Sequence, residues 1–288
     1  MGQNWYGDLR GTANQMNYTL CFVGGGNMAR SLIGGLLAQG MRAEQIIAAD
    51  PLAAQLDALR SDYGIRVAQN NLAAVQGADV VVLAVKPQEM RAVAAELRQV
   101  LEGGGPLLIS VAAGIRAADI QRWSGCAAVV RCMPNRPALV GCGVTGLFAT
   151  DAVSAQQRGI AEAILKAVGR TLWLEREADM DAVTAISASG PAYFFFLIEI
   201  LEQSGVALGL TPEVSRTLAV ETAFGAGSMA RAATQPAAVL RAQVTSAGGT
   251  TEAALRHLEA HSVRAIFQEA VTAAARRATE LADAFGVP

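Results

Sequence analysis

The chain has 288 residues, of which 52% are hydrophobic, and a formal net charge of −2. This length allows two domains, and the apolar fraction supports a large core rather than a disordered chain. The near-neutral charge argues against a nucleic-acid partner. The longest uninterrupted apolar stretch, residues 191–198, is shorter than a membrane span, so we expect no membrane partner.

The cysteines and histidines show no metal-binding pattern. The four cysteines lack C-x-x-C spacing, which favours small buried thiols in a reducing cytosol and predicts a cytoplasmic protein. His257 and His261 lie four residues apart without an acidic or thiol partner at a recognisable spacing, so a solvated helix face is favoured and no metal is expected. Residues 1–15 are polar, aperiodic and unlike a signal peptide. We expect them to be an N-terminal extension, disordered or of cloning origin.

Strands and helices alternate through the first half of the chain. The expected strands are residues 18–23, 46–49, 65–68, 79–85, 107–111 and 127–132, with edge strands at 144–148 and 171–174. The expected helices are residues 27–39, 51–63, 72–76, 88–101 and 154–168. Repeated β-α units with short connections predict an α/β Rossmann-type, doubly wound parallel sheet. Ligands of such sheets bind beyond the carboxyl ends of the strands, so the turns that follow the strands should converge on one cleft.

Strand patterns disappear near residue 174. The expected helices are then 179–208, interrupted at residues 189–191, followed by 211–233, 236–243, one that starts at 252, and 262–285. We therefore predict a dinucleotide-binding domain at residues 16–174 and an all-helical domain at residues 175–288. The segment 181–200 is apolar on nearly every side, which predicts that a homodimer interface buries it.

A glycine-rich turn between the first strand and the first helix predicts a nucleotide site. Gly24, Gly26 and Ala29 have the spacing G-x-G-x-x-A. Gly24 permits a tight turn, and Gly26 lets a pyrophosphate approach the backbone at the positive end of the helix. Asp50 ends the second strand about twenty residues later, where an acidic side chain binds ribose hydroxyls and disfavours a 2′-phosphate. This position favours NADH. We also expect Asp50 and Pro51 to open the next helix.

A second glycine segment, residues 243–252, joins two helices of the second half. The N–H groups of Gly249, Thr250 and Thr251 are expected to form an anion hole of carboxylate size. Thr250 or Thr251 is expected to cap the helix that starts at Glu252. An ordinary Gly-Gly connection followed by a threonine cap explains the same residues as well as an anion site does.

Together these segments resemble the pyrroline-5-carboxylate reductase family over about residues 18–285. The motifs that carry the resemblance are FVGGGNMA at 22–29, LAVKPQ at 83–88, SVAAG at 110–114, RCMPN at 131–135, SGPAY at 189–193 and VTSAGGTT at 244–251. The last looks like the signature of the family. The resemblance implies a Rossmann domain joined to a helical domain that forms interleaved dimers, often assembled into decamers. It also implies reduction of 1-pyrroline-5-carboxylate to L-proline with NADPH or NADH, the last step of proline biosynthesis.

The resemblance, with the position of Asp50, assigns two sets of site residues. The cofactor set is Gly24, Gly25, Gly26, Asn27, Met28, Asp50, Asn71, Ala84, Val85, Lys86, Pro87, Val111, Ala112 and Ala113. The substrate set is Ser246, Gly248, Gly249, Thr250 and Thr251. The reaction needs the substrate carboxylate bound, the ring carbon aligned with the nicotinamide, and a hydrogen bond to the imine nitrogen. Thr251 is the expected catalytic donor.

Three positions depart from the family pattern, and three other functions compete. Arg136, Ala188 and Ala247 stand where threonine, glycine and proline are usual. Arg136 has three open interpretations: exposure to solvent, preference for the NADPH phosphate, or a changed substrate. Family members commonly use NADPH, so we expect use of both cofactors. The alternatives are an imine reductase for another cyclic imine and a non-catalytic nucleotide-sensing dimer. A β-hydroxyacid dehydrogenase is disfavoured, because Lys86 and Lys166 both precede the helical domain.

Overall fold

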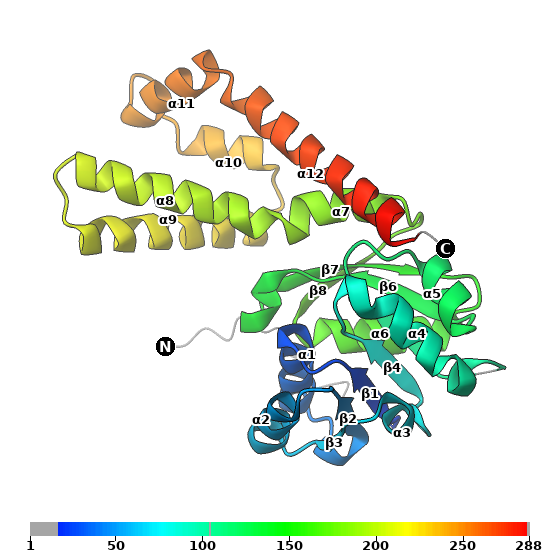
Figure 1. The fold of residues 1–288 in the computed structure, drawn as a ribbon. Helices are drawn as coiled ribbons and strands as arrows, with labels where there is room; N and C mark the ends of the chain where they lie inside the picture. The colour runs from blue at the N-terminus through cyan, green and yellow to red at the C-terminus, as the bar shows by residue number, and fades with distance from the viewer. Residues whose placement is uncertain (1–16, 104, 287–288) are drawn as a thin grey trace. The chain divides into compact units, whose positions relative to one another are not determined.

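A computed structural model describes residues 17–103 and 105–286. The predicted extension at residues 1–15 lies outside this part of the chain. Packing divides the chain into two compact units, one that runs to Ala188 and resumes at Ala275, and one formed by Ser189–Ala274. The first unit is α/β and the second is all helical (Figure 1). The predicted domain division at residue 174 follows the last strand instead, and stays a prediction.

An eight-stranded sheet lies at the centre of the first unit, in the order β3-β2-β1-β4-β5-β6-β7-β8. The strands are β1 (Leu20–Val23), β2 (Ile46–Ala49), β3 (Arg66–Ala68), β4 (Val80–Leu83), β5 (Leu107–Ser110), β6 (Val129–Met133), β7 (Gly143–Ala149) and β8 (Gly169–Trp173). All pairings from β3 to β6 are parallel, as the Rossmann prediction requires. However, β7 is antiparallel to β6 and parallel to β8, so the last two strands are reversed.

The reversal of β7 follows from its short connection to β6. Only a 3-10 turn, Arg136–Val140, separates the two strands, and a parallel return needs a crossover of about a dozen residues or more. The connection from β7 to β8 contains a full helix, α6 (Ala155–Lys166), and these two strands are parallel. Ser154 caps α6 by accepting a hydrogen bond from the Gln157 N–H.

Helices cover both faces of the sheet. Buried residues of α1 (Asn27–Ala38), α2 (Ala53–Tyr63) and α6 pack on one face. Buried residues of α3 (Asn71–Val75), α4 (Pro87–Leu101) and α5 (Ala117–Ser124) pack on the other. The helix α5 is absent from the sequence prediction, although Ala117, Ile120 and Trp123 are buried at helical spacing and Gly125 ends the helix with φ 71°.

The first unit also contains the segment after β8. Here α7 (Asp179–Val183) continues into a π-helical turn, Thr184–Ala188. The last turns of α12 (Val263–Phe285), from Ala275 onward, return to this unit. The predicted interruption of the long helix at residues 189–191 lies at the start of α8, directly after the π-helical turn. Such turns occur often at functional sites.

The second unit consists of α8 (Gly190–Ala207), α9 (Pro212–Ala232), α10 (Ala237–Gln243), α11 (Thr250–Ala260) and the first half of α12. Thr211 caps α9, because its hydroxyl accepts a hydrogen bond from the Val214 N–H at 3.3 Å. The helices α8 and α9 lie side by side (Figure 1). Within one chain, α8 leaves Phe194, Phe195 and Phe196 exposed at 64%, 62% and 60%.

The helical run Asp179–Ala207 is, in the described chain, long and apolar enough to cross a membrane by length and composition. Its mean hydropathy is 1.5, and 11% of its apolar window is buried. The sequence prediction counted only uninterrupted apolar residues and therefore judged this segment too short. The same surface is what a dimer interface requires, so composition alone does not select a membrane.

Candidate functional site

The glycine turn after β1 lies between the ends of β2 and β4. The N–H of Gly24 donates to the Ala49 carbonyl at 2.8 Å. Gly24 has φ 101°, and a Cβ at this position would lie 2.6 Å from the Ala84 carbonyl oxygen. A side chain is therefore excluded twice, by backbone conformation and by space. This confirms the tight turn that the sequence predicts.

Asp50 holds this turn. Its Oδ2 accepts a hydrogen bond from the Gly25 N–H at 2.8 Å, and its Oδ1 accepts one from the Leu52 N–H at 2.9 Å. The predicted helix start at Asp50 and Pro51 is wrong, because α2 begins at Ala53 with Leu52 as its N-cap residue. The Asp50 carboxylate therefore stabilises the glycine turn and does not act as the N-cap of α2. Each oxygen keeps one lone pair for a further hydrogen bond, as a ribose hydroxyl would require.

The N-terminus of α1 fits an anion. Gly26 is its N-cap residue and makes no side-chain cap, and the first turn contains no acidic residue. A Cβ added to Gly26 would have no atom within 4 Å. Asn27 is exposed and Met28 is half-buried. Free N–H groups, a positive helix end and open space beside a glycine are the features that hold the phosphates of a dinucleotide.

The other cofactor-set residues follow the neighbouring strands. Ala84, Val85, Lys86 and Pro87 come after β4, and Val111, Ala112 and Ala113 come after β5. The Ala84 N–H donates to Val23 at 2.8 Å, and the Val111 N–H donates to Leu83 at 3.1 Å. The structure thus brings the ends of β1, β2, β4 and β5 to one edge of the sheet.

Asn71 lies at the start of α3. Asn70, the residue before it, caps this helix by accepting a hydrogen bond from the Ala73 N–H at 3.0 Å. The Asn71 side chain donates instead to Glu96 Oε2 at 3.0 Å. Its amide is therefore partly engaged within the chain.

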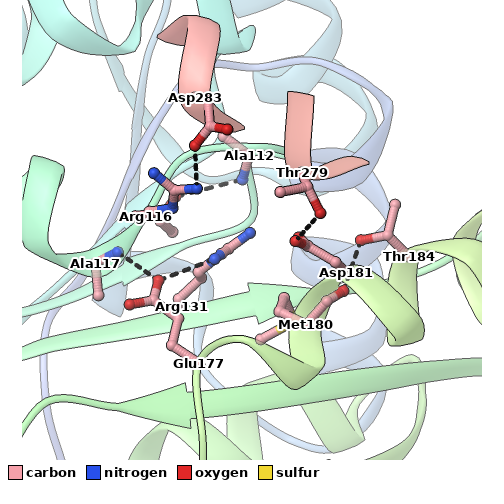
Figure 2. Close-up of polar contacts among 11 residues, drawn as sticks. Ala112, Arg116, Ala117, Arg131, Glu177, Met180, Asp181, Thr184, Thr279 and Asp283 are labelled. Carbon is pink, nitrogen blue, oxygen red and sulfur yellow. Dashed lines mark hydrogen bonds and ion pairs between the residues drawn. The ribbon is translucent and has the colours of Figure 1, made fainter. Parts of the chain in front are cut away.

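Two buried polar residues lie beside this edge of the sheet: Arg131 in β6 and Asn135 shortly after it. The sequence predicts no individual role for either side chain. Arg131 is 3% exposed and pairs with Glu177 Oε1 at 2.9 Å. The same oxygen accepts the Ala117 N–H at 2.7 Å (Figure 2). Glu177 therefore joins β6, the start of α5 and the segment before α7. The motif at residues 131–135 includes Arg131, but no spacing rule in the sequence links Arg131 to Glu177.

Asn135 makes a second link between β6 and the π-helical turn. Its Nδ2 donates to the Ser187 carbonyl at 3.2 Å, and its Oδ1 accepts the Val144 N–H at 2.9 Å. The Ser187 hydroxyl is buried and has no hydrogen-bond partner in the described chain. Arg136, the next residue, is exposed at the first position of the 3-10 turn. Its exposure is consistent with the solvent interpretation.

The second glycine segment lies in the helical unit. Gly248 has φ 72°, and the Gly249 N–H donates to the Ser246 carbonyl at 3.1 Å. This corrects the predicted anion hole, because the Gly249 N–H closes a turn. The predicted helix start at Glu252 is also wrong: α11 begins at Thr250, with Gly249 as its N-cap residue and no side-chain cap.

Glu252 lies in the first turn of α11 and modifies the anion site. Its Oε2 accepts a hydrogen bond from the Gly248 N–H, and its Oε1 accepts one from Arg256 at 3.2 Å. The negative charge is thus compensated by an arginine one turn later. Thr251 is half-buried, and Thr250 and Ser246 are exposed. The described residues provide no hydrogen-bond partner for the Thr251 hydroxyl, so it is free for a ligand.

The cofactor set lies in the first unit and the substrate set in the second, and the structure describes each by itself. In the described residues, no group of three or more His, Cys, Asp or Glu side chains is placed to hold a metal ion.

Comparison with known proteins identifies both halves. Residues 177–281 match the family model described as pyrroline-5-carboxylate reductase dimerisation. Residues 19–114 match the model described as NADP oxidoreductase coenzyme F420-dependent. A curated pyrroline-5-carboxylate reductase of Pseudomonas aeruginosa is 48% identical over 268 residues, which cover 93% of this chain and 98% of that protein.

Solved structures agree with this similarity. A pyrroline-5-carboxylate reductase of Coxiella burnetii is 41% identical with a TM-score of 0.88, covering 92% of this chain and 98% of that chain. The Plasmodium falciparum pyrroline carboxylate reductase, solved with NADP bound, is 29% identical with a TM-score of 0.81 and the same coverage.

Proposed function

The chain belongs to the pyrroline-5-carboxylate reductase family, and from this premise we propose how its residues carry out the reaction of that family. The reaction is the reduction of 1-pyrroline-5-carboxylate to L-proline with NADPH or NADH, the last step of proline biosynthesis. The single observation that carries the residue assignment is the N-terminus of α11. Gly249 leaves it without a side-chain cap, and the free Thr251 hydroxyl lies in its first turn.

The cofactor set binds the dinucleotide along the edge of the sheet. The N–H groups that follow Gly26 hold the pyrophosphate, because this helix end is uncapped and has no acidic residue in its first turn. Asp50 binds the adenosine ribose, and Asn71 reaches the adenosine. The segments at 84–87 and 111–113 line the nicotinamide end of the cleft. When bound, the cofactor supplies the hydride.

The substrate set binds the acceptor. The N–H groups of Thr250 and Thr251 receive the carboxylate at the positive end of α11. Ser246 and the glycines Gly248 and Gly249 shape the turn beside it. The Thr251 hydroxyl donates a hydrogen bond to the imine nitrogen, which orients the ring. Arg256 matters here because its pairing with Glu252 limits the repulsion between that acid and the substrate carboxylate.

Cofactor preference depends on Asp50. Its carboxylate repels a 2′-phosphate, which supports NADH, whereas the Plasmodium falciparum relative was solved with NADP. We propose that the enzyme uses both. Measuring kcat/KM with each cofactor tests this proposal, and a much higher value for NADPH would refute the role of Asp50.

Assembly and location complete the proposal. We propose a catalytic division at residue 174, with residues 16–174 binding cofactor and residues 175–288 binding substrate and a second copy. The exposed face of α8 supports a homodimer, and we propose that dimers assemble into decamers. Buried unpaired thiols support a cytoplasmic location. The small net charge and the dimer face support no nucleic-acid or membrane partner.

The deciding experiment follows NAD(P)H oxidation with 1-pyrroline-5-carboxylate for the wild type, Thr251→Ser and Thr251→Ala. We expect turnover by the wild type, most of it retained by Thr251→Ser, and a loss of about 10²-fold in kcat/KM for Thr251→Ala. Turnover only with another cyclic imine would identify the alternative imine reductase. Cofactor binding without any turnover would identify the nucleotide-sensing dimer. Full activity of Thr251→Ala would reject the donor role alone.

A further inference from the structure

The C-terminal end of α12 packs on the loop between β5 and α5. Phe285 lies in the last turn of α12 and packs against the buried cluster that includes Ala112. A Cβ on Gly114 would lie 3.2 Å from Cδ2 of Phe285 and 3.6 Å from Cβ of Leu281. The loop therefore contacts α12 through a glycine, and the missing side chain leaves room for the phenyl ring.

Polar contacts hold the same end of α12 to α5. Arg116 Nη2 donates to Asp283 Oδ1 at 2.5 Å (Figure 2), and this hydrogen bond raises the pKa of Arg116. Arg122 Nη2 donates to the Gly286 carbonyl at 2.9 Å and lies 2.8 Å from Oδ1 of the buried Asp119. The C-terminal end of α12 is thus bound to the N-cap residue of α5 and to Arg122 in its last turn.

A cavity of about 200 Å³ lies where α12, the β5–α5 loop and the start of α4 meet. Leu281 and Phe285 line it from α12, Pro87 from the start of α4, and Ala113 from the β5–α5 loop. Thr279 donates to Asp181 Oδ2 at 2.7 Å, which fixes α12 at one side of the cavity (Figure 2). Pro87 and Ala113 belong to the cofactor set, so α12 and the cofactor residues share this cavity.

Two hydrogen bonds hold the start of the loop, and the first joins the Val111 N–H to the Leu83 carbonyl at 3.1 Å. Within it, the Ala112 N–H donates to Ser110 Oγ at 3.3 Å, a long bond that spans two residues. The Arg116–Asp283 pair is solvent-exposed, with 40% and 64% of the two side chains accessible. Exposed pairs contribute little to stability. The pair nevertheless connects α12 directly to Arg116, two residues after the loop 111–114.

We propose that Phe285, Asp283 and Arg116 are positioning residues that hold the loop 111–114 in the conformation that binds NAD(P)H. The inference rests on the proposed function, because it requires Val111–Ala113 to line the cofactor cleft. These three side chains act through the loop. Their loss weakens cofactor binding and leaves the substrate set, which lies in the other unit, unchanged.

The test compares Phe285→Ala and Phe285→Leu with the wild type in the full-length enzyme. Fluorescence titration gives the Kd for NADPH, and steady-state kinetics give kcat and both KM values. We expect Phe285→Ala to raise the Kd and the KM for NADPH about tenfold. The KM for 1-pyrroline-5-carboxylate and kcat at saturating NADPH should stay within about twofold of the wild type. Phe285→Leu should restore most of the affinity, because an apolar side chain again covers the loop.

The exposed ion pair provides variants that keep the fold. Arg116→Glu should weaken NADPH binding at an unchanged melting temperature, and adding Asp283→Arg should restore it, because the exchanged charges pair again. Leu165→Ala is the stability control, since Leu165 is fully buried in the cluster on the opposite face of the sheet. It should lower the melting temperature without changing the Kd for NADPH.

Each outcome separates the two proposals. A wild type that binds NADPH but does not reduce 1-pyrroline-5-carboxylate overturns the proposed function. If the wild type is active, wild-type NADPH affinity in both Phe285→Ala and Arg116→Glu overturns the positioning role. An equal rise in Kd for Leu165→Ala also overturns it, since lost stability would then explain the effect.

Discussion

Gly24 and Gly26 lie two residues apart, and we expect alanine to have a different effect at each position. Gly24→Ala should lower the stability of the fold, whereas Gly26→Ala should weaken NADPH binding. Gly24 has φ 101°, and an added Cβ would lie 2.6 Å from the Ala84 oxygen and 2.8 Å from its carbonyl carbon. Both atoms are backbone and cannot rotate away. Gly26 has an ordinary negative φ and no atom within 4 Å of an added Cβ. The pair thus allows a glycine needed by the fold to be compared with a glycine that we propose is needed for cofactor binding.

The cost of Gly24→Ala has two parts. A positive φ costs a non-glycine residue about 1–2 kcal/mol, and crowding against fixed backbone adds about 1–3 kcal/mol. The free energy of unfolding should fall by about 2–5 kcal/mol, a large part of the roughly 5–15 kcal/mol that a domain has. At about 2–4 °C per kcal/mol, the melting temperature should fall by about 4–20 °C.

Gly26→Ala should cost below about 1 kcal/mol, the difference between glycine and alanine at an N-cap position. Its methyl group would occupy the space assigned to the pyrophosphate, so the Kd for NADPH should rise at least about tenfold. Differential scanning fluorimetry without ligand measures the first quantity, and NADPH fluorescence titration measures the second.

Two results would refute this reasoning. Wild-type NADPH affinity in Gly26→Ala would show that the phosphates do not lie at the N-terminus of α1. A wild-type melting temperature for Gly24→Ala would show that the turn is not crowded.

Three further predictions concern thiols, pH and assembly. Iodoacetamide should modify only Cys142 in the native enzyme and all four cysteines after unfolding, as mass spectrometry can show, because burial raises the pKa of the other three thiols. The Lys166 ammonium, 2.7 Å from Glu162, lowers the pKa of that carboxyl, so its stabilisation is present at neutral pH and is lost as pH falls through the lowered pKa. Glu162→Gln should therefore melt below the wild type at pH 7, and a gap that persists in acid would contradict this. Phe195→Glu should convert dimers to monomers, because it places a carboxylate on the exposed apolar face of α8. Light scattering measures the mass in solution, and an unchanged mass would place the interface elsewhere.

The sequence predicts those features whose cause lies within a few residues. Gly24 shows its role because only glycine permits this turn. The caps at Asn70 and Thr211 are equally local, since a cap requires only a side chain and an N–H three residues later. The Rossmann strands are recognisable because they are short, apolar and rich in β-branched residues.

The sequence does not reveal which side chains bind partners that are distant in the chain. Asp50 looks like a helix cap, but its carboxylate accepts the N–H of Gly25, 25 residues earlier. Asn71 has the place of a cap and binds Glu96. Glu177 carries no motif, and it gains its role from Arg131, 46 residues away in the chain. No local spacing reports such contacts.

The course of α12 affects how the protein is made. The α/β unit takes back the chain from Ala275 onward, after the whole helical unit has been synthesised. These residues are synthesised after residues 189–274, so the loop at Gly114 stays uncovered until Phe285 has been made. Domains otherwise tend to fold from the N-terminus as they emerge. In this enzyme the first unit is completed only after the helical unit has been synthesised, and a product truncated before Ala275 lacks the residues that cover the loop at Gly114.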